Sequence, residues 1–236
     1  MRIAVLEDDA AQAELLQSWF RNAGHPSKLF TTGSAFKNAL RHETFDLLVL
    51  DWNLPDTSGP DILAWVRANI DWHIPVLFAT SREQEEDIVY ALEHGADDYM
   101  TKPVRQRETL ARIAALERRA QPAGEPGAPV VFGPFEFDTS SRRVRSGQES
   151  VELTNKEFEL ALLLFRNSGR LLSRSYILEH VWGTSAELST RTVDTHISRV
   201  RNKLRIHPNR GVRLGAVYNH GYRLELLRAS EASGGA

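Results

Sequence analysis

Short apolar runs alternate with longer amphipathic stretches over the first half of this chain. Strands are predicted at five of these runs: Ile3–Leu6, Lys28–Phe30, Leu47–Leu50, Pro75–Ala79 and Asp98–Met100. The runs are brief and mostly apolar, which is typical of parallel strands whose sheet is covered on both faces. The stretches between them carry apolar residues at helical spacing over about 10–15 residues. This pattern predicts an α/β fold for residues 1–120, with a doubly wound sheet of five parallel strands.

A different pattern begins after residues 121–129, a segment rich in Pro, Gly and Ala that predicts a linker. Residues 130–151 alternate apolar and polar positions between turn signals, which indicates a small antiparallel sheet. Three helices are predicted next: one opened by the capping box of Thr154 and Glu157, one capped by Ser173, and one over about residues 189–205.

The chain closes with a hairpin and a short tail. Residues 212–227 alternate around a turn at Asn219-His220-Gly221, and residues 229–236 are predicted to be a disordered tail. A sheet, three helices and a hairpin together predict a small α+β winged helix-turn-helix domain over residues 130–228.

Polar residues that suit phosphoryl chemistry follow three of the predicted strands. They are Glu7-Asp8-Asp9, Asp51 and Thr101-Lys102-Pro103. In an open parallel sheet the carboxyl ends of the strands meet at one edge, where ligands bind. Several carboxylates with a lysine opposite them suit Mg²⁺ and a phosphoryl group. The sequence therefore predicts that Asp51 is phosphorylated.

The composition excludes several classes of protein. Because none of the 236 residues is cysteine, disulfides and thiolate metal sites are excluded, and the eight histidines follow no metal-binding spacing. No apolar run is long enough to span a bilayer, and Met1-Arg2 leads directly into a strand rather than a signal peptide. We therefore expect a cytoplasmic protein without membrane contact.

Charge is distributed unevenly between the two halves. Residues 1–120 carry 13 Lys/Arg and 19 Asp/Glu, a net charge of −6, whereas residues 121–236 carry 16 and 12, a net charge of +4. Most of the excess positive charge falls within residues 191–213, which hold seven Lys/Arg and one acid, Asp194. An acidic half joined to a basic half indicates a regulatory domain linked to a nucleic-acid-binding domain.

The predicted helix over residues 189–205 has one apolar and one polar face. Its apolar stripe is formed by Val193, Ile197, Val200 and Leu204. The opposite face offers arginine, hydroxyl and amide groups suited to the major groove of DNA, from Arg191, Thr195, Ser198, Arg199 and Asn202. Base contacts are predicted for Arg199 and Asn202, a thymine methyl contact for Thr195, and phosphate contacts for Arg191, Arg201 and Lys203.

Several motifs together resemble a known family. The first half resembles the receiver domain of bacterial response regulators through Glu7-Asp8, Asp51-Trp52-Asn53-Leu54-Pro55, Thr80 and the run 95–103. The second half resembles the effector domain of the OmpR/PhoB subfamily through Leu153-Thr154, Glu157-Phe158, the run 193–197 and Gly221-Tyr222-Arg223. The resemblance implies a DNA-binding response regulator of a two-component system, which regulates transcription and is not an enzyme in the usual sense.

The resemblance implies a phosphoacceptor and a magnesium site in the receiver. Asp51 accepts the phosphoryl group from a sensor histidine kinase, and the phosphoprotein has at most an autophosphatase activity. Mg²⁺ is bound directly by Asp8 and Asp51, by Glu7 through water, and by the backbone carbonyl of Asn53.

It also implies a switch. Lys102 and the hydroxyl of Thr80 contact the phosphoryl group, and the Lys102–Pro103 peptide bond is expected to be cis. When Thr80 is drawn toward the phosphoryl group, Tyr99 is expected to rotate inward beside the sheet.

Activated members of the family pair through the fourth helix, fifth strand and fifth helix of the receiver, and the homodimer binds repeated DNA sites. The matching residues of this chain are Ile88, Asp97, Asp98, Glu108 and Arg112. Ile88 stands where a basic residue is expected opposite Glu108. The sequence therefore leaves open whether pairing requires phosphorylation.

The wing departs from the family pattern as well. An Arg-Gly pair is expected where this chain has Tyr218-Asn219, so the arginine that enters the minor groove is missing. Arg213 or His220 is predicted to compensate. RNA polymerase is a further expected partner.

Three alternative interpretations fit some of the same residues. One is a regulator of the same build whose receiver is a constitutive, phosphorylation-independent dimer. Another is a phosphatase of the haloacid dehalogenase type, which expects a second Asp at position 53 and Thr or Val at position 55, where this chain has Asn53 and Pro55. The last is an acidic cluster that merely solvates strand ends, which leaves Lys102 unexplained.

Overall fold

The computed structural model describes residues 1–120, 129–183, 189–218 and 220–227. Contacts divide the chain into two compact units, Met1–Pro122 and Ala123–Ala236. The predicted tail at 229–236, Asn219 and all but the last residue of the predicted linker at 121–129 lie outside the described residues.

The first unit is built on a five-stranded parallel sheet with the order β2-β1-β3-β4-β5. Its strands are β1 (Ile3–Leu6), β2 (Ser27–Phe30), β3 (Leu47–Leu50), β4 (Val76–Thr80) and β5 (Asp98–Thr101). The doubly wound fold is thus confirmed, with strand bounds within one residue of the predicted ones. In the sheet, β2 lies on one side of β1 and β3 lies on the other. The direction in which successive strands are added therefore reverses between β1 and β3. A ligand crevice is expected at such a reversal, beyond the carboxyl ends of the strands.

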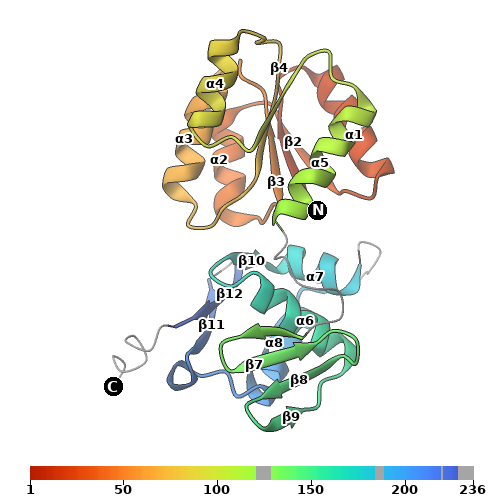
Figure 1. Cartoon of the computed structure of the whole chain (residues 1–236), viewed down its shortest axis with the longest axis vertical. Coiled ribbons are helices and arrows are strands. Elements are labelled where there is room, and N and C mark those ends of the chain that lie inside the picture. Colours follow the sequence, from red (N-terminus) through yellow and green to blue (C-terminus); the bar gives the residue numbers. More distant parts are fainter. Residues whose placement is uncertain (121–128, 184–188, 219, 228–236) are drawn as a thin grey trace. The chain divides into compact units, whose positions relative to one another are not determined.

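Helices cover both faces of this sheet (Figure 1). They are α1 (Ala10–Asn22), α2 (Gly33–His42), α3 (Gly59–Asn69), α4 (Glu85–Glu93) and α5 (Gln106–Ala120). Alternate strand residues face two separate apolar clusters: Val5 packs with residues of α1 and α5, whereas Leu48 packs with residues of α2, α3 and α4. All four residues of β1 and of β3 are buried, which explains their continuous apolar runs.

Gly59 allows α3 to begin directly beside β3. A Cβ atom at this position would lie 2.4 Å from the backbone oxygen of Asp51 and 2.7 Å from the Phe78 ring. Ser58 caps the helix through the amide of Asp61, and Pro60 occupies the first turn, where its missing N–H costs no hydrogen bond. Glycine at position 59 therefore sets how closely α3 approaches the segment that follows Asp51.

The described residues of the second unit form two antiparallel sheets and three helices. A four-stranded sheet runs in the order β6-β7-β8-β9, and a three-stranded sheet in the order β10-β12-β11. The strands are β6 (Val130–Phe132), β7 (Phe135–Asp138), β8 (Arg143–Ser146), β9 (Glu149–Val151), β10 (Leu171–Ser173), β11 (Val212–Val217) and β12 (Gly221–Leu226). The helices are α6 (Asn155–Arg166), α7 (Arg174–Trp182) and α8 (Arg191–Lys203), with a 3-10 turn at Pro208–Arg210.

Capping motifs in the sequence correctly predicted where α6 and α7 begin. The capping box of Thr154 and Glu157 opens α6, and the Ser173 side chain caps α7 through the amide of Tyr176. Strand β10 was not predicted, because its three residues are too few to show alternation and its partner β12 lies about 50 residues further along the sequence. The winged-helix architecture is confirmed: a helical core flanked by a small sheet and a β11–β12 hairpin.

Candidate functional site

Three acids and a lysine converge beyond the carboxyl ends of the strands of the first unit. Glu7 and Asp8 follow β1, Asp51 follows β3 and Lys102 follows β5. One carboxylate oxygen from each acid lies within 4.8 Å of one from each of the others. The Lys102 ammonium is 2.7 Å from Asp51 Oδ2 and 2.8 Å from Glu7 Oε2. The structure thus brings together the four charged groups that the sequence placed at this edge.

Burial perturbs the charged groups of this cluster. Glu7 is 1% exposed and Asp51 is 6% exposed, whereas Asp8 is exposed to solvent. Burial raises the pKa of Glu7 more than the Lys102 ammonium lowers it. Burial alone would lower the pKa of Lys102, but its hydrogen bonds to Asp51 and Glu7 raise it instead. Lys102 therefore stays charged and compensates two carboxylates in a largely buried site.

The donor set fits a hard divalent cation. Glu7, Asp8 and Asp51 offer only oxygen ligands, and exposed Asp8 leaves one side of the cluster open to water. Mg²⁺ prefers oxygen ligands and usually keeps several waters. The third acid of the first motif, Asp9, has another role, because it caps α1 through the amides of Ala11 and Gln12. Asn53 lies in the adjoining loop, which a backbone bridge to Ser58 closes.

The predicted switch residues lie beside this cluster. Thr80 is fully buried, and its Oγ1 accepts a hydrogen bond from the Arg82 amide at 3.3 Å. The Tyr99 ring is stacked on Phe78 at 6.0 Å, and its hydroxyl donates to the Arg82 backbone oxygen at 2.8 Å. Burial, together with the nearby Asp87 carboxylate, raises the pKa of Tyr99 to about 12. Tyr99 thus already points inward in this structure, and the Lys102–Pro103 bond is cis as expected.

Residues predicted for the dimer surface make ion pairs within the receiver. Arg112 on α5 is 2.8 Å from Asp98 and 2.9 Å from Glu108. Ile88 is half-buried and packs against the core, while its neighbours Val89 and Leu92 on α4 are 43% and 44% exposed. The α4 surface therefore offers apolar groups, and the α5 surface offers charges that are already paired.

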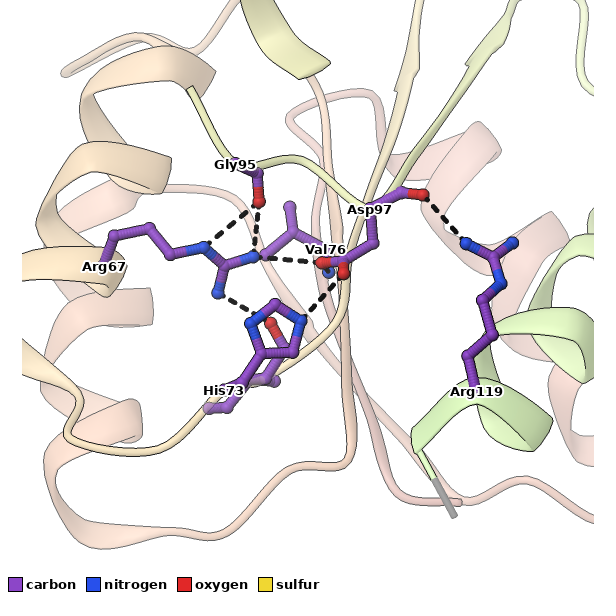
Figure 2. A network of polar contacts seen from close by, with 7 residues as sticks. Arg67, His73, Val76, Gly95, Asp97 and Arg119 are labelled. Atoms are coloured by element: carbon purple, nitrogen blue, oxygen red, sulfur yellow. Dashed lines mark hydrogen bonds and ion pairs between the residues drawn. The ribbon is translucent and has the colours of Figure 1, made fainter. Parts of the chain in front are cut away.

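Asp97 is engaged inside the domain, as Figure 2 shows. Its Oδ2 accepts from Arg67 at 3.0 Å and from the Val76 amide at 2.8 Å, and its Oδ1 lies 2.8 Å from His73 Nε2. Arg119 of α5 reaches only the Asp97 backbone oxygen, at 3.4 Å. The structure thus gives the Asp97 carboxylate a role in joining α3, β4 and β5, and its part in a dimer stays a prediction.

The polar face predicted for α8 is exposed. Val193, Ile197 and Val200 are buried in the core, which confirms the apolar stripe. The face that the stripe leaves to solvent carries Arg191, Thr195, Ser198, Arg199 and Asn202. The Thr195 hydroxyl donates to the Arg191 backbone oxygen at 3.1 Å, so its methyl group is the part left free for an apolar contact.

Other predicted DNA-contacting residues have partners within the domain. Arg201 donates to the Leu214 backbone oxygen at 2.9 Å, and Lys203 lies 2.7 Å from the buried carboxylate of Glu157. Arg213 is 3.5 Å from Glu225. Arg201 and Lys203 thereby tie the end of α8 to β11 and α6. Their phosphate contacts stay a prediction.

One basic residue beside α8 was not predicted. Arg174, the first residue of α7, donates from Nε to Asp194 Oδ1 at 2.9 Å. The same oxygen accepts from the Tyr222 hydroxyl at 2.7 Å. No sequence spacing relates these residues, because α7, α8 and β12 are brought together only by tertiary packing.

Comparison with known proteins agrees with this architecture. The protein-family model for the response regulator receiver domain matches residues 3–114. The protein-family model for the C-terminal domain of transcriptional regulatory proteins matches residues 147–224. The chain is therefore a DNA-binding response regulator of a two-component system, which regulates transcription. Within that class, it belongs to the OmpR/PhoB family.

Curated relatives span nearly the full chain. Sensory transduction protein RegX3 of Mycolicibacterium smegmatis is 35% identical over 226 residues, covering 94% of this chain and 98% of the relative. Response regulator protein PmrA of Pseudomonas aeruginosa is 37% identical over 204 residues, covering 86% and 91%. The solved structure of DrrB, a Thermotoga maritima OmpR/PhoB homolog, is 30% identical, covers 95% of this chain and 98% of its own, and has a TM-score of 0.47.

Within the described part of the chain, every helix is too short or too polar to cross a membrane.

Proposed function

We propose that a sensor histidine kinase phosphorylates Asp51 and that phosphorylation makes this regulator pair through α4, β5 and α5 and bind repeated DNA sites. The observation that carries the proposal is the cluster of Glu7, Asp8, Asp51 and Lys102 at one edge of the sheet. A cluster that only solvated strand ends would not bury Glu7 and Asp51 around an ammonium group.

The cluster accounts for each part of the transfer. An Asp51 carboxylate oxygen forms a bond to phosphorus while the P–N bond of the kinase phosphohistidine breaks, and the bond electrons return to the imidazole nitrogen. Lys102, already 2.7 Å from Asp51, pairs with a phosphoryl oxygen. Asp8, Asp51 and the Asn53 backbone carbonyl would hold Mg²⁺ directly and Glu7 would hold it through water, and the bound ion would neutralise charge at the phosphoryl oxygens. Hydrolysis of the acyl phosphate by water is the only turnover proposed.

The switch follows from added charge. A phosphoryl group carries about −1.5 to −2 charge at neutral pH and accepts strong hydrogen bonds. Thr80 sits beside the site and its hydroxyl is the donor we assign to that group. Moving Thr80 alters the segment whose Arg82 backbone oxygen holds the Tyr99 hydroxyl. This connection relates Asp51 to β5 and hence to the pairing surface.

The second unit supplies the DNA contacts. The exposed face of α8 enters the major groove, with Arg199 and Asn202 at base edges, Thr195 at a thymine methyl and Arg191 at a phosphate. Two winged helices joined by a receiver dimer gain affinity for repeated sites through effective concentration. We place this activity in the cytoplasm, with RNA polymerase as a further partner.

The solution mass of the purified chain tests the proposal. Light scattering is measured with and without Mg²⁺ and beryllofluoride, for the native chain and for Asp51→Asn. A monomer that becomes a dimer only with the phosphoryl mimic, and only when Asp51 is present, supports the proposal. A native chain that remains monomeric with the mimic contradicts it.

A second candidate function is a constitutive dimer that binds DNA without phosphorylation. The half-buried Ile88 and exposed Val89 and Leu92 favour it, because an apolar α4 surface can pair without a new charge. This candidate predicts a dimer without the mimic and an unchanged mass for Asp51→Asn.

A further inference from the structure

The segment that joins β3 to α3 is closed at its base by backbone contacts. We call residues 52–58 the β3–α3 loop. The Gly59 amide donates to the Trp52 backbone oxygen at 2.8 Å, and Asn53 forms a backbone bridge with Ser58. These contacts join the two ends of the loop and fix its start, next to the phosphoacceptor. The tip of the loop lies beyond this bridge and is held by a different contact.

Asp56 attaches the tip of the loop to α2. Its Oδ1 accepts from the Gly33 amide at 2.8 Å, and its Oδ2 accepts from the Ser34 amide at 3.0 Å. Both amides belong to the first turn of α2, where backbone N–H groups have no partner within the helix. The hydroxyl of Thr32 accepts from the Ala35 amide at 3.4 Å, so two side chains from separate segments cap this helix. The carboxylate of Asp56 thus connects the loop to a helix start that lies 23 residues earlier in the chain.

The approach of the loop to α2 depends on glycine at position 33. A Cβ atom at this position would lie 2.4 Å from Thr57 Cγ2 and 2.8 Å from Ile62 Cδ1. This close packing lets the Asp56 carboxylate reach both amides. The backbone hydrogen bonds from Gly33 and Ser34 lower the pKa of Asp56, although its side chain is exposed. At neutral pH the contact is therefore a charged carboxylate at a helix N-terminus, where negative charge is favourable.

We propose that Asp56 is a positioning residue for the phosphoacceptor site: it fixes the β3–α3 loop on α2 so that the backbone carbonyl of Asn53 is ordered before a divalent cation binds. This inference rests on the proposed function, in which Asp8, Asp51 and that carbonyl hold Mg²⁺. Thr32 already caps α2 from the adjoining residue, whereas Asp56 contributes its cap from the loop that carries Asn53. Ordering a ligand before binding removes an entropy cost from the binding step.

The affinity of the full chain for divalent cations tests this role. Free Mn²⁺ is measured by electron paramagnetic resonance, and the affinity for Mg²⁺ follows from its displacement of bound Mn²⁺, so Trp52 in the loop is not the reporter. Asp56→Ala removes both acceptors and is expected to weaken binding of both ions about tenfold, the lower end of the effect of residues that orient metal ligands. Asp56→Asn keeps one oxygen acceptor and is expected to lose less. Native affinity for both ions in Asp56→Ala would overturn the proposal.

Two controls separate positioning from helix capping and from charge. Thr32→Ala removes the other cap of α2 but keeps the contact to the loop, so it is expected to lower the melting temperature of the receiver without changing cation affinity. Asp56→Ala also removes a negative charge. Salt screens an effect of charge but not one of position, so affinities are compared in about 0.05 M and about 0.5 M KCl. A loss that disappears in high salt, or an equal loss in Thr32→Ala, would refute the positioning role.

Amide hydrogen exchange supplies a readout that needs no cation. In Asp56→Ala, the amides of the β3–α3 loop are expected to exchange faster than in the native chain, because the tip of the loop is no longer tied to α2. Thr32→Ala is expected to leave exchange in the loop unchanged. Native exchange rates in the loop of Asp56→Ala would contradict the proposal.

The native chain separates this inference from the proposed function. If it binds neither Mn²⁺ nor Mg²⁺, the proposed metal site fails and the inference fails with it. If it binds both ions but its mass does not change with Mg²⁺ and beryllofluoride, the proposed switch fails, and the affinity of Asp56→Ala still decides the role of Asp56. If the switch operates and Asp56→Ala binds both ions with native affinity, the proposed function stands and the role of Asp56 is wrong.

Discussion

Replacing Lys102 by methionine tests the electrostatic account of the receiver site. Lys102→Met keeps a long, unbranched side chain but removes the ammonium that lies 2.7 Å from Asp51 and 2.8 Å from Glu7. The side chains of Glu7 and Asp51 are only 2% and 7% exposed. In the variant, two carboxylates would share this site without a compensating cation. We therefore expect the receiver to be less stable.

The size of the loss follows from burial. Removing one partner of a buried ion pair costs about 3–5 kcal/mol. Lys102 keeps 16% exposure, Asp8 leaves the site open to water, and Glu7 can take up a proton, so we expect about 2–3 kcal/mol at neutral pH. Without Lys102, the already raised pKa of Glu7 rises further. A folded-state pKa above the unfolded one gives stability that is present at low pH and lost as pH rises through it. The difference from the native chain should therefore shrink as pH falls.

Urea unfolding in EDTA measures this effect. Four of the five tryptophans, at positions 19, 52, 65 and 72, lie in the receiver, so fluorescence reports mainly on that unit. We expect a smaller loss at pH 5.5 than at pH 7.5, and recovery when Mg²⁺ binds the uncompensated carboxylates. Lys28→Met is the control, since that lysine is 47% exposed and its pair with Glu43 is worth about 0–1 kcal/mol. A loss below about 0.5 kcal/mol, which is the size of an ordinary surface change, or a loss independent of pH would refute the reasoning.

Three further predictions concern the metal site, α8 and the wing. The affinity of the native chain for Mg²⁺ should weaken on acidification, and the change should begin at a pH above 4.5, the ordinary pKa of Glu, because Glu7 has a raised pKa and binds protons in competition with the ion. Trp52 fluorescence measures this affinity. In Glu7→Gln the dependence of affinity on pH should be weaker. Lys203→Met should lower the free energy of unfolding in urea by about 1 kcal/mol at pH 7, because it removes the ion-pair partner of buried Glu157. The hydrogen bonds from Lys203 and Thr154 hold the pKa of Glu157 below 4.5 despite burial. The cost should therefore disappear as the pH falls through the lowered pKa of Glu157. Tyr218, the exposed residue directly after β11, is the third site: Tyr218→Arg should tighten binding of a DNA duplex and steepen the slope of log K against log salt by about 0.9 if the wing contacts a phosphate. An unchanged slope would place the wing away from the phosphates.

Burial on both faces of the sheet made the receiver strands predictable. Helices cover both faces of the sheet, so residues that face opposite sides, such as Val49 and Phe78, are both buried. Strands β1 and β3 are therefore uninterrupted apolar runs with polar residues directly after them. The same geometry explains why Glu7, Asp51 and Lys102 could be placed in one crevice from their positions at strand ends. Caps at Thr154 and Ser173 depend on local hydrogen bonds and were equally visible in sequence.

Partners of long polar side chains were not predictable in this way. Asp97 follows a turn in sequence, but its contacts with Arg67 and His73 depend on how α3 and the segment before β4 pack. The link from Arg174 to Asp194 likewise spans 20 residues and two helices. Charged side chains reach several ångströms in many directions, so residue type and periodicity define the exposed face but not the partner chosen on it.

Ion pairs within the receiver limit what charge can contribute to assembly. Arg112 already holds Asp98 and Glu108, so pairs formed across a dimer would replace existing contacts rather than add to them. Exposed pairs are worth about 0–1 kcal/mol, and an exchange of one for another is worth less. The apolar groups on α4 make no contact in the single chain that pairing would replace, because Val89 and Leu92 are exposed to water. If the receivers pair through α4 as proposed, each Å² of this apolar surface that is covered contributes about 25 cal/mol. In the proposed dimer, phosphorylation would act by changing the shape of this apolar surface, and the charges around it would set how the two receivers align.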